Sequence, residues 1–393
     1  MTPSRRARRP ARQAALAGVA ALAVASGSLV WGATSADASQ LTAESSIAVG
    51  PTSSAAATGF RDAARYGAGY LARQITANGG YLAPFGSPDD GNTAYAVVAL
   101  TAAGVGGNAS RSAIAYLKTR VADGLTDSSG ADNAGTLANL VLAAVAAGEN
   151  PRAFGGTTDA HNLVARLQAT RRTSGPDRGL FGAADPTYDG AYRQGLALTA
   201  LKAAGVAPTN VATAEAWLER QQCADGLWAS YRADTAVPCS AADLATFSGP
   251  DTNSTALAVE GLEAYGSAPM RWKTLAALGA VQSTDGGFPF LAAPGQASEP
   301  NSTAVVIQAL VATGSKPTWG RWVKGGRNPY QALSAYQLGC GDTTGDRGAY
   351  YYPGSRTANV LATVQAVPAQ VGASLPVTHQ ATRPGAPTLS CVS

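Results

Sequence analysis

Between Ala216 and Gly266, hydrophobic and polar positions follow one order that predicts two successive helices. The first segment has mixed polar and apolar residues and ends at Asp225-Gly226, a glycine stop of the kind that terminates helices. An aromatic residue, Trp228, comes directly after this turn. The second segment, residues 250–265, opens with polar capping residues, continues with apolar residues at helical spacing and stops at Gly266. The unit is therefore a helix, a glycine turn with an aromatic residue, a loop and a capped helix.

The same unit recurs along the chain. Clear copies span residues 282–314 and 70–104, and weaker copies span 114–148, 163–205 and 330–367. In five units the second helix ends at a glycine, and successive glycines are 44 to 61 residues apart. They are Gly104, Gly148, Gly205, Gly266 and Gly314. Repeats of this length indicate an array, here of six helix pairs.

The second helix of each pair differs from the first in polarity. Residues 93–103 and 137–147 are almost wholly apolar and small, which is typical of a helix buried on all sides. The first helices carry more charge and suit a half-exposed position. Six buried and six half-exposed helices predict an all-α fold, an α6/α6 toroid of two concentric rings over residues 60–367. The alternative is an open α-solenoid, which needs polar capping faces that neither terminal pair provides.

Residues 1–38 have the organisation of a secretory signal peptide. Five arginines between Arg5 and Arg12 precede an uncharged apolar run, residues 14–30, and the small residues of Ala36-Asp37-Ala38 predict cleavage after Ala38. A retained membrane anchor is the competing interpretation, and the apolar run is short for a span. Arg5-Arg6 leaves open whether export uses the general or the twin-arginine route. We therefore expect a secreted protein.

Composition and charge outside the leader change the picture little. The chain has 393 residues and 46% hydrophobic content, enough for a large buried core. Its net charge of +4 is matched by the five arginines and Asp37 of the leader, so the mature chain is near neutral. This balance argues against nucleic acid as a partner. Residues 39–59 are expected to be a flexible lead-in, and residues 368–393 a tail.

All four cysteines lie in the expected mature chain. An even number in an exported protein predicts two disulfides, for which three pairings exist. Cys223 and Cys239 bracket the loop inside one unit, so we pair them, which leaves Cys340 with Cys391 to fasten the tail. With no Cys-x-x-Cys and only two histidines, a zinc site is not expected.

The residues of the repeat carry a resemblance to a known superfamily. Trp217-Leu218, Gln222 and Gly226-x-Trp228 resemble the QW repeat of squalene and oxidosqualene cyclases, and Gln282-x-x-Asp-Gly-Gly-Phe288 is similar to a turn of protein prenyltransferase β subunits. The resemblance covers about residues 60–367 and implies an α6/α6 toroid with a central cavity at whose mouth the inner helices begin. It is much less specific for activity.

The catalytic motifs of these relatives are incomplete in this chain. Class II terpene cyclases protonate an alkene with the middle acid of Asp-x-Asp-Asp, and the two aligned positions here are Gly91 and Asn253. Asp90 is adjacent, but a shift of one residue turns a helical side chain by about 100° and points it elsewhere. Asn253 also stands where the prenyltransferase zinc site has cysteine. We therefore expect neither a metal nor a catalytic residue.

Two further relatives complete the comparison. Gly339-Cys340-Gly341-Asp342-Thr343 resembles the motif of complement-type thioester domains, but it lacks the glutamine that forms the thioester. The toroid is also similar to the α-domain of intrinsic factor and transcobalamin, which binds cobalamin without chemistry. That resemblance implies a corrinoid as a possible ligand rather than a cofactor.

Candidate ligand-binding residues are those near inner-helix starts and those that break the apolar pattern. Carboxylates there are favoured by the helix dipole in any case, whereas aromatic residues with polar tips suit a binding cavity. The candidates are Asp89, Asp90, Tyr95, Tyr188, Asp189, Tyr192, Arg193, Asp251, Asn253, Tyr350 and Tyr351.

These observations predict a secreted, non-catalytic toroid that binds a large, partly apolar ligand such as a corrinoid. A small molecule, or a separate secreted or membrane protein, is the expected partner. The alternatives are an extracytoplasmic terpenoid cyclase or prenyltransferase-like enzyme and a protein-binding scaffold. An open cavity with a carboxylate buried against aromatic residues would favour the enzyme, and an open cavity with a broad polar rim would favour the binder. A centre filled by side chains would favour the scaffold. The sequence does not indicate an oligomeric state.

Overall fold

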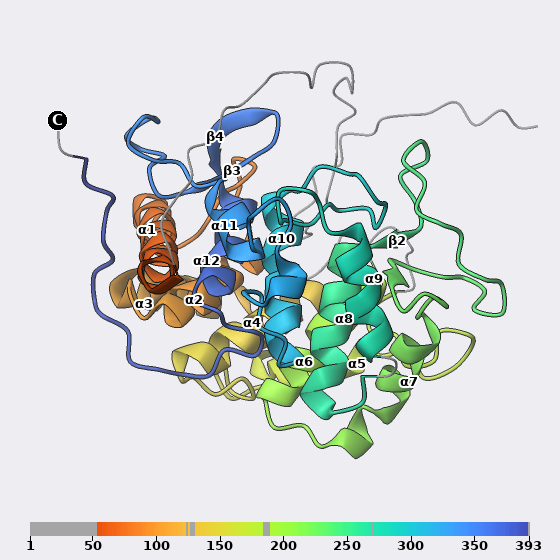
Figure 1. The fold of residues 1–393 in the computed structure, drawn as a ribbon. Coiled ribbons are helices and arrows are strands. Elements are labelled where there is room, and N and C mark those ends of the chain that lie inside the picture. The colour runs from red at the N-terminus through yellow and green to blue at the C-terminus, as the bar shows by residue number, and fades with distance from the viewer. Residues whose placement is uncertain (1–52, 123–124, 126–129, 184–188, 269–270, 392–393) are drawn as a thin grey trace, which may run out of the picture.

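Two rings of helices form the body of the protein. The computed structural model describes residues 53–122, 125, 130–183, 189–268 and 271–391, so the predicted leader lies outside the described residues (Figure 1). The inner helices are α2 (Asp90–Ala103), α4 (Ala134–Ala147), α6 (Ala191–Ala203), α8 (Thr252–Tyr265), α10 (Pro300–Ala312) and α12 (Val360–Gln370). Each packs against the next, and α12 packs against α2, so the inner ring is closed. The predicted α/α toroid is confirmed, and the open solenoid is wrong.

The outer helices alternate with the inner ones along the chain. They are α1 (Ser53–Ala77), α3 (Gly107–Arg120), α5 (Leu163–Ala169), α7 (Ala212–Arg220), α9 (Arg271–Val281) and α11 (Pro329–Ser334). Helix α1 packs on both α2 and α12 and so covers the seam between the first and last inner helices. It begins inside the segment 39–59 that we expected to be a flexible lead-in, where the run Ala55-Ala56-Ala57 has high helix propensity.

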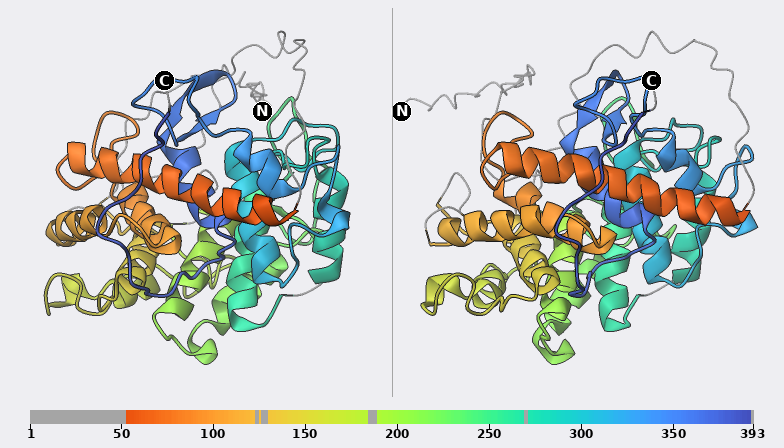
Figure 2. Two further views of the ribbon diagram at one scale, coloured as in Figure 1. Left: turned by 60° about the vertical axis from the view of Figure 1, so that its left-hand side comes forward. Right: turned by 90° about the vertical axis from the view of Figure 1, so that its left-hand side faces the viewer.

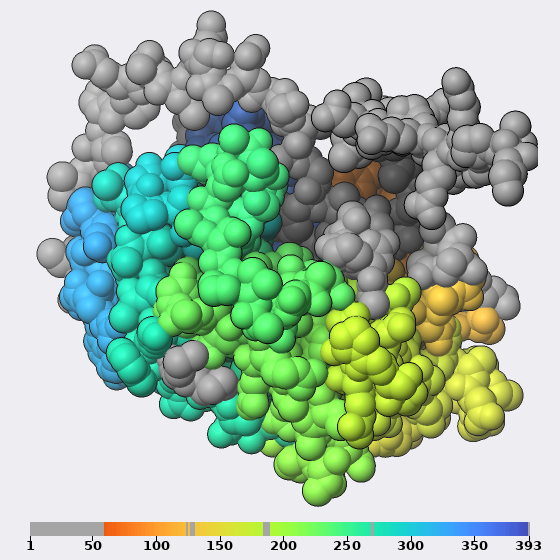
Figure 3. Space-filling model, turned by 90° about the vertical axis from the view of Figure 1, so that its right-hand side faces the viewer, coloured from red at the N-terminus to blue at the C-terminus, as the bar shows by residue number. Residues whose placement is uncertain are grey.

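The little strand structure consists of two short antiparallel pairs. Strands β1 (Trp228–Ala229) and β2 (Pro250–Asp251) close the base of a long loop, and β3 (Tyr350–Tyr352) pairs with β4 (Ser355–Asn359). The loop between β1 and β2 stands out at the right of Figure 1 and forms the green protrusion at the top of Figure 3. Short 3-10 turns lie at Asp159–His161, Pro208–Asn210 and Gly320–Trp322.

One hydrogen bond recurs in four of the repeats and explains the threonine near the start of their inner helices. The hydroxyl oxygen of that threonine accepts the backbone N–H of the residue after the turn, at 2.9 Å in four repeats: Leu82 to Thr93, Trp228 to Thr255, Phe288 to Thr303 and Tyr350 to Thr363. The aromatic residues that follow these turns in the later repeats are buried between helix pairs. The repeat residues therefore fasten each outer helix to its inner neighbour.

Both predicted disulfides are present. Cys223 pairs with Cys239 and Cys340 with Cys391, and no cysteine is free among the described residues. No described helix has both the length and the apolar character that crossing a membrane requires.

We expect that replacing both Cys223 and Cys239 by serine lowers the free energy of unfolding by about 3 kcal/mol, because the 16-residue separation removes that much loop entropy from the unfolded chain. Denaturant unfolding without reductant measures the loss. A change below about 1 kcal/mol would show that the loop is held by other contacts instead.

Residues 371–391, here called the strap, run across the end of the inner ring where its helices finish. The Arg383 N–H donates to the Gly104 carbonyl at 3.0 Å, and a His379 ring nitrogen lies 3.0 Å from the Ala146 carbonyl oxygen. Figure 2 shows the strap in dark blue passing the ends of the inner helices and then crossing α1. The predicted tail is thus packed against the toroid, and α12 continues to Gln370, three residues beyond the predicted end of the repeats.

Candidate functional site

One end of the inner ring is lined by capped helix starts. The side chains of Asp89, Asn133, Asp251 and Asn359 each accept a backbone N–H three residues further on, at 2.6 to 3.0 Å. These N-cap residues satisfy donors that the helix itself leaves unpaired. We call this end of the ring the rim. Its polar residues are therefore explained by helix capping before any ligand is considered.

Burial raises the pKa values of three carboxyl groups at the rim. Desolvation raises the pKa of Asp251 to about 6, against hydrogen bonds from Ser254 that lower it. Burial also raises the pKa values of Asp89 and Glu299. Asp189 accepts the Ala183 N–H at 2.6 Å and an Arg193 N–H at 3.0 Å, so Arg193 forms its ion pair at the rim.

Asp90 points away from the interior. Its carboxylate accepts the Tyr116 hydroxyl at 3.0 Å and the Arg120 Nε–H at 3.4 Å, and both partners lie on outer helix α3. Gly91 faces inward instead, because a side chain added there would approach Thr136 and Asn139 of α4. As expected, successive side chains on the helix point in different directions here. Asp90 therefore does not take the place of the catalytic middle acid of Asp-x-Asp-Asp.

The inward faces of the inner helices carry a second group of polar residues, which we call the interior cluster. Asn301 donates to Gln365 Oε1 at 2.9 Å, and Gln365 donates to the Tyr192 hydroxyl at 3.2 Å. The Tyr95 hydroxyl donates to Gln308 Oε1 at 3.3 Å. These bonds join helices from opposite parts of the chain across the ring. The interior cluster consists of Tyr95, Asn139, Tyr192, Asn253, Glu260, Asn301, Gln308 and Gln365.

Several atoms of the interior cluster have no hydrogen-bond partner although they are fully buried. They are Asn139 Oδ1, Asn253 Oδ1 and Nδ2, Glu260 Oε1, Asn301 Oδ1 and Gln308 Nε2. Each such atom costs about 1–3 kcal/mol of desolvation without a compensating bond. Native interiors contain few such atoms. Single ones also occur outside the interior cluster, at Gln282, Tyr350 and Gln370, whereas those of the cluster are grouped on α4, α8 and α10. Ordered water or a ligand can supply the missing partners.

Glu260 is the carboxyl group of this cluster. It lies on α8 and is 1% exposed, and one oxygen accepts the backbone N–H of Leu375 from the strap at 3.1 Å. Burial raises its pKa to about 8, so the group carries its proton at neutral pH. Its charge also raises the pKa values of Tyr95 and Tyr192, which places all three groups near one another.

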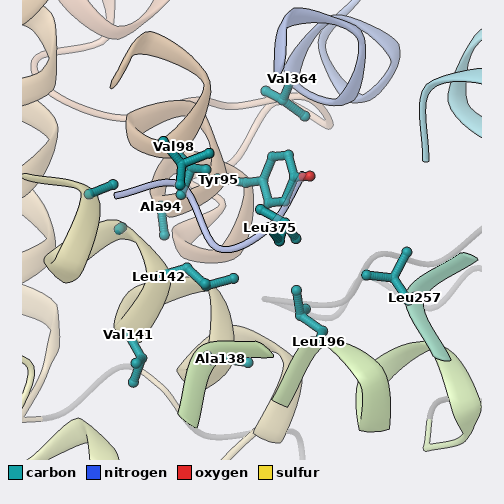
Figure 4. Close-up of a cluster of buried hydrophobic side chains, with 14 of the residues drawn as sticks. Ala94, Tyr95, Val98, Ala138, Val141, Leu142, Leu196, Leu257, Val364 and Leu375 are labelled. Carbon is teal, nitrogen blue, oxygen red and sulfur yellow. The ribbon is translucent and has the colours of Figure 1, made fainter. Parts of the chain in front are cut away.

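Apolar side chains surround these polar groups. Figure 4 shows Leu196, Leu257, Val364 and Leu375 gathered on the side of Tyr95 that carries its hydroxyl. Leu375 comes from the strap and is 4% exposed. The strap thus contributes both an apolar side chain and a backbone donor to the interior.

The structure separates the candidates predicted from sequence into distinct groups. Tyr95, Tyr192 and Asn253 belong to the interior cluster, and Asp89, Asp189, Arg193 and Asp251 lie at the rim. Tyr350 packs with Phe60 and Tyr330 between α1, α11 and α12. The Tyr351 ring lies under Arg356 and meets the Tyr336 ring at a tilt of 57°. Neither belongs to the interior cluster. Tyr188 lies outside the described residues.

Sequence reasoning did not single out Asn139, Glu260, Asn301, Gln308 or Gln365. A signal for Glu260 was present, because it is seven residues after Asn253 on a helix with few other polar residues, and residues at that spacing share a face. Asn301 and Gln308 repeat the spacing on α10.

The rest of the described surface offers weaker candidates for a ligand-binding or metal-binding site. Among the described residues, no three histidine, cysteine or carboxylate side chains are placed to hold a metal ion. A groove of about 350 Å³ lies between α1 and the strap, lined by Arg65, Tyr66 and Arg383, but it is outside the ring.

The comparison with known proteins defines the fold. No protein-family model matches the sequence, and no curated protein matches it. Among solved structures, it is similar to the apo form of the type II terpene cyclase MstE from Scytonema, with 16% identity over 81% of this chain and 97% of that chain and a TM-score of 0.52. The chain therefore shares its α/α toroid fold with this terpene cyclase.

A second similar structure is ent-copalyl diphosphate synthase from Streptomyces platensis, with 18% identity and a TM-score of 0.46 over 76% of this chain. This chain spans about half of that protein, 53% of its length. Both resemblances concern the fold, and the activity of this chain must be argued from its own residues.

Proposed function

We propose that this protein is a secreted, non-catalytic toroid that binds a partly apolar ligand inside its inner ring. The observation that carries the proposal is the group of buried, unpartnered polar atoms on three inner helices, α4, α8 and α10, together with the leucine and valine side chains of the interior (Figure 4). An apolar site with a few convergent polar groups is the usual composition of a small-molecule pocket. The two disulfides support export.

We propose a non-catalytic protein because neither position that aligns with the acid of a class II cyclase carries a carboxyl group. These positions are Gly91, which has no side chain, and Asn253, whose amide cannot protonate an alkene. Glu260 holds a proton, but burial raises its pKa to about 8, which makes it a weak acid. A weak acid suits hydrogen-bond donation to a ligand better than protonation of a carbon–carbon double bond.

A corrinoid is one ligand of the required kind, because its amide side chains surround an apolar macrocycle. Amide groups are complementary to Asn253, Asn301 and Gln308, which offer both donors and acceptors. A separate secreted or membrane protein that closes the rim or receives the ligand remains part of the proposal.

We expect native mass spectrometry of the exported protein to show a bound small molecule, or an adduct with added cyanocobalamin, and ligand at 100 times its Kd to stabilise the fold by about 2.7 kcal/mol. The double variant Asn253→Leu and Asn301→Leu should lose the adduct, while Asn108→Leu, an exposed amide on α3, should keep it. Absence of any ligand from the wild type would favour the scaffold.

The terpenoid-cyclase alternative is favoured by one observation, a protonated carboxyl group near two tyrosines inside the ring. Incubation with squalene and with geranylgeranyl diphosphate, followed by gas chromatography and mass spectrometry, distinguishes it from binding alone. Cyclic products that disappear in Glu260→Gln would replace the binding proposal, and we expect none.

A further inference from the structure

Charge within the inner helices restricts the ligand, provided that the proposed binding function holds. Their only basic residues are Arg193 and Lys202. Arg193 is bonded to Asp189 at the rim, and Lys202 is exposed, over the ring of Tyr265. A phosphate or carboxylate inside the ring would therefore meet buried carboxyl groups and no free cation, which is unfavourable.

A cation is also poorly matched to the deeper part of the interior. Glu260 is the carboxyl group there, and because its pKa is raised to about 8 it is uncharged at neutral pH. The remaining members of the interior cluster are amides and tyrosines. The interior cluster thus offers hydrogen bonds, and within the described part of the chain it carries no full charge of either sign.

The polar groups occupy two levels along the ring axis. On α8, Asn253 and Glu260 are seven residues apart on one face, a separation of about 10 Å at the helical rise of 1.5 Å per residue. Leu257 lies between them and points into the interior (Figure 4). Helix α8 therefore presents polar, apolar and polar groups in that order.

Helix α10 repeats this order independently. Asn301 and Gln308 are again seven residues apart, with Val305 between them, and Val305 is 1% exposed. Unpartnered atoms occur at both levels: Asn253 and Asn301 near the rim, and Glu260 and Gln308 deeper in the ring. Each level offers donors as well as acceptors, which hydroxyl, carbonyl or amide groups complement.

We infer that the ligand is an uncharged, elongated molecule with a hydroxyl, carbonyl or amide group at each end of an apolar body. The group near the rim bonds to Asn253 and Asn301, and the deeper group bonds to Glu260 and Gln308. The apolar body lies against Leu196, Leu257 and Val364.

A steroid series tests this inference on the wild-type protein. The probe is 5α-androstane-3β,17β-diol, compared by isothermal titration and native mass spectrometry with 5α-androstan-3β-ol, 5α-androstane and the 3,17-disulfate. We expect the diol to bind, the mono-ol to bind about ten-fold more weakly, since one hydrogen bond is lost, and the hydrocarbon and the disulfate not to bind.

Single substitutions in the protein test which residues bind each polar end of the ligand. Asn253→Leu and Gln308→Leu should each weaken diol binding about ten-fold, whereas Glu215→Gln, at a buried carboxyl group on outer helix α7, should leave it unchanged. Circular dichroism checks that each variant folds, and the ligand series on the wild type needs no variant.

The possible outcomes separate the two proposals. If the disulfate or the hydrocarbon binds as well as the diol, the inference of an uncharged, two-ended ligand is wrong while the binding function stands. If cyanocobalamin alone binds, the elongated shape is likewise wrong. If no compound binds and no molecule co-purifies, both proposals fail.

Discussion

Raising the pH from 4.5 to 8 is expected to lower the free energy of unfolding by about 5 kcal/mol through Glu260 alone, at 1.36 kcal/mol for each pH unit. In the folded protein, burial raises the pKa of Glu260 to about 8 from an ordinary value of 4.5. Between these values the folded state retains a proton that the unfolded state has released. Stability therefore falls as pH rises through this window and changes no further above pH 8.

The Glu260→Gln variant isolates this effect. An amide has nearly the same shape, can still accept the Leu375 N–H and does not ionise, so the variant should lose the pH dependence and be more stable than the wild type at pH 8. Denaturant unfolding at several pH values measures both. Glu215→Gln retains Glu260 and should retain its pH dependence. Parallel curves for the wild type and Glu260→Gln would show that Glu260 is ionised in the folded protein.

Gly195→Ala is expected to cost more than about 4 kcal/mol, because α6 and α8 meet backbone to backbone at this glycine. A Cβ atom at Gly195 would lie 1.9 Å from the Leu257 carbonyl oxygen, and one at Gly261 would lie 2.7 Å from Gly195. No side-chain rotation relieves contact with a backbone atom. The two inner helices would have to separate, and the closed ring would be disturbed.

Gly279→Ala is the matched control for this prediction. Gly279 is also inside a helix, α9, but an added Cβ would meet only one ring atom of Trp322, at an ordinary 3.7 Å. Alanine there should stabilise by about 0.5–1 kcal/mol through helix propensity. Thermal unfolding of the two variants should shift in opposite directions. Equal shifts would mean that the close approach of α6 and α8 is not what Gly195 permits.

The sequence was sufficient for the fold because the fold is local and repeated. Four of the six inner helices have a side-chain cap at their start, and each has a left-handed glycine at or just beyond its end, such as Asp251 and Gly266 on α8. Both signals act within one helix and can be read without knowledge of its neighbours. The disulfides were predictable for a related reason, since Cys223 and Cys239 bracket a single loop.

The interior cluster was less predictable because it depends on ring closure. Whether Gln308 or Tyr350 faces the interior is decided by the rotation of each helix against its neighbours, which residue spacing does not fix. Tyr350 breaks the apolar pattern as Tyr192 does, yet it lies at a strand and packs outside the inner ring. The contribution of Leu375 was also hidden, because an irregular segment has no periodicity from which its buried face can be read.

The strap has a consequence for the order in which the protein can form. The Gln380 side chain donates to the carbonyl of Thr101, 279 residues earlier in the chain. During synthesis, helices α2 and α4 are complete long before the residues that cover their ends. Until then the first repeats expose an apolar face to water, which is the condition under which chaperones bind a nascent chain. The pairing of Cys340 with Cys391 then fastens the end of the strap to the last repeat.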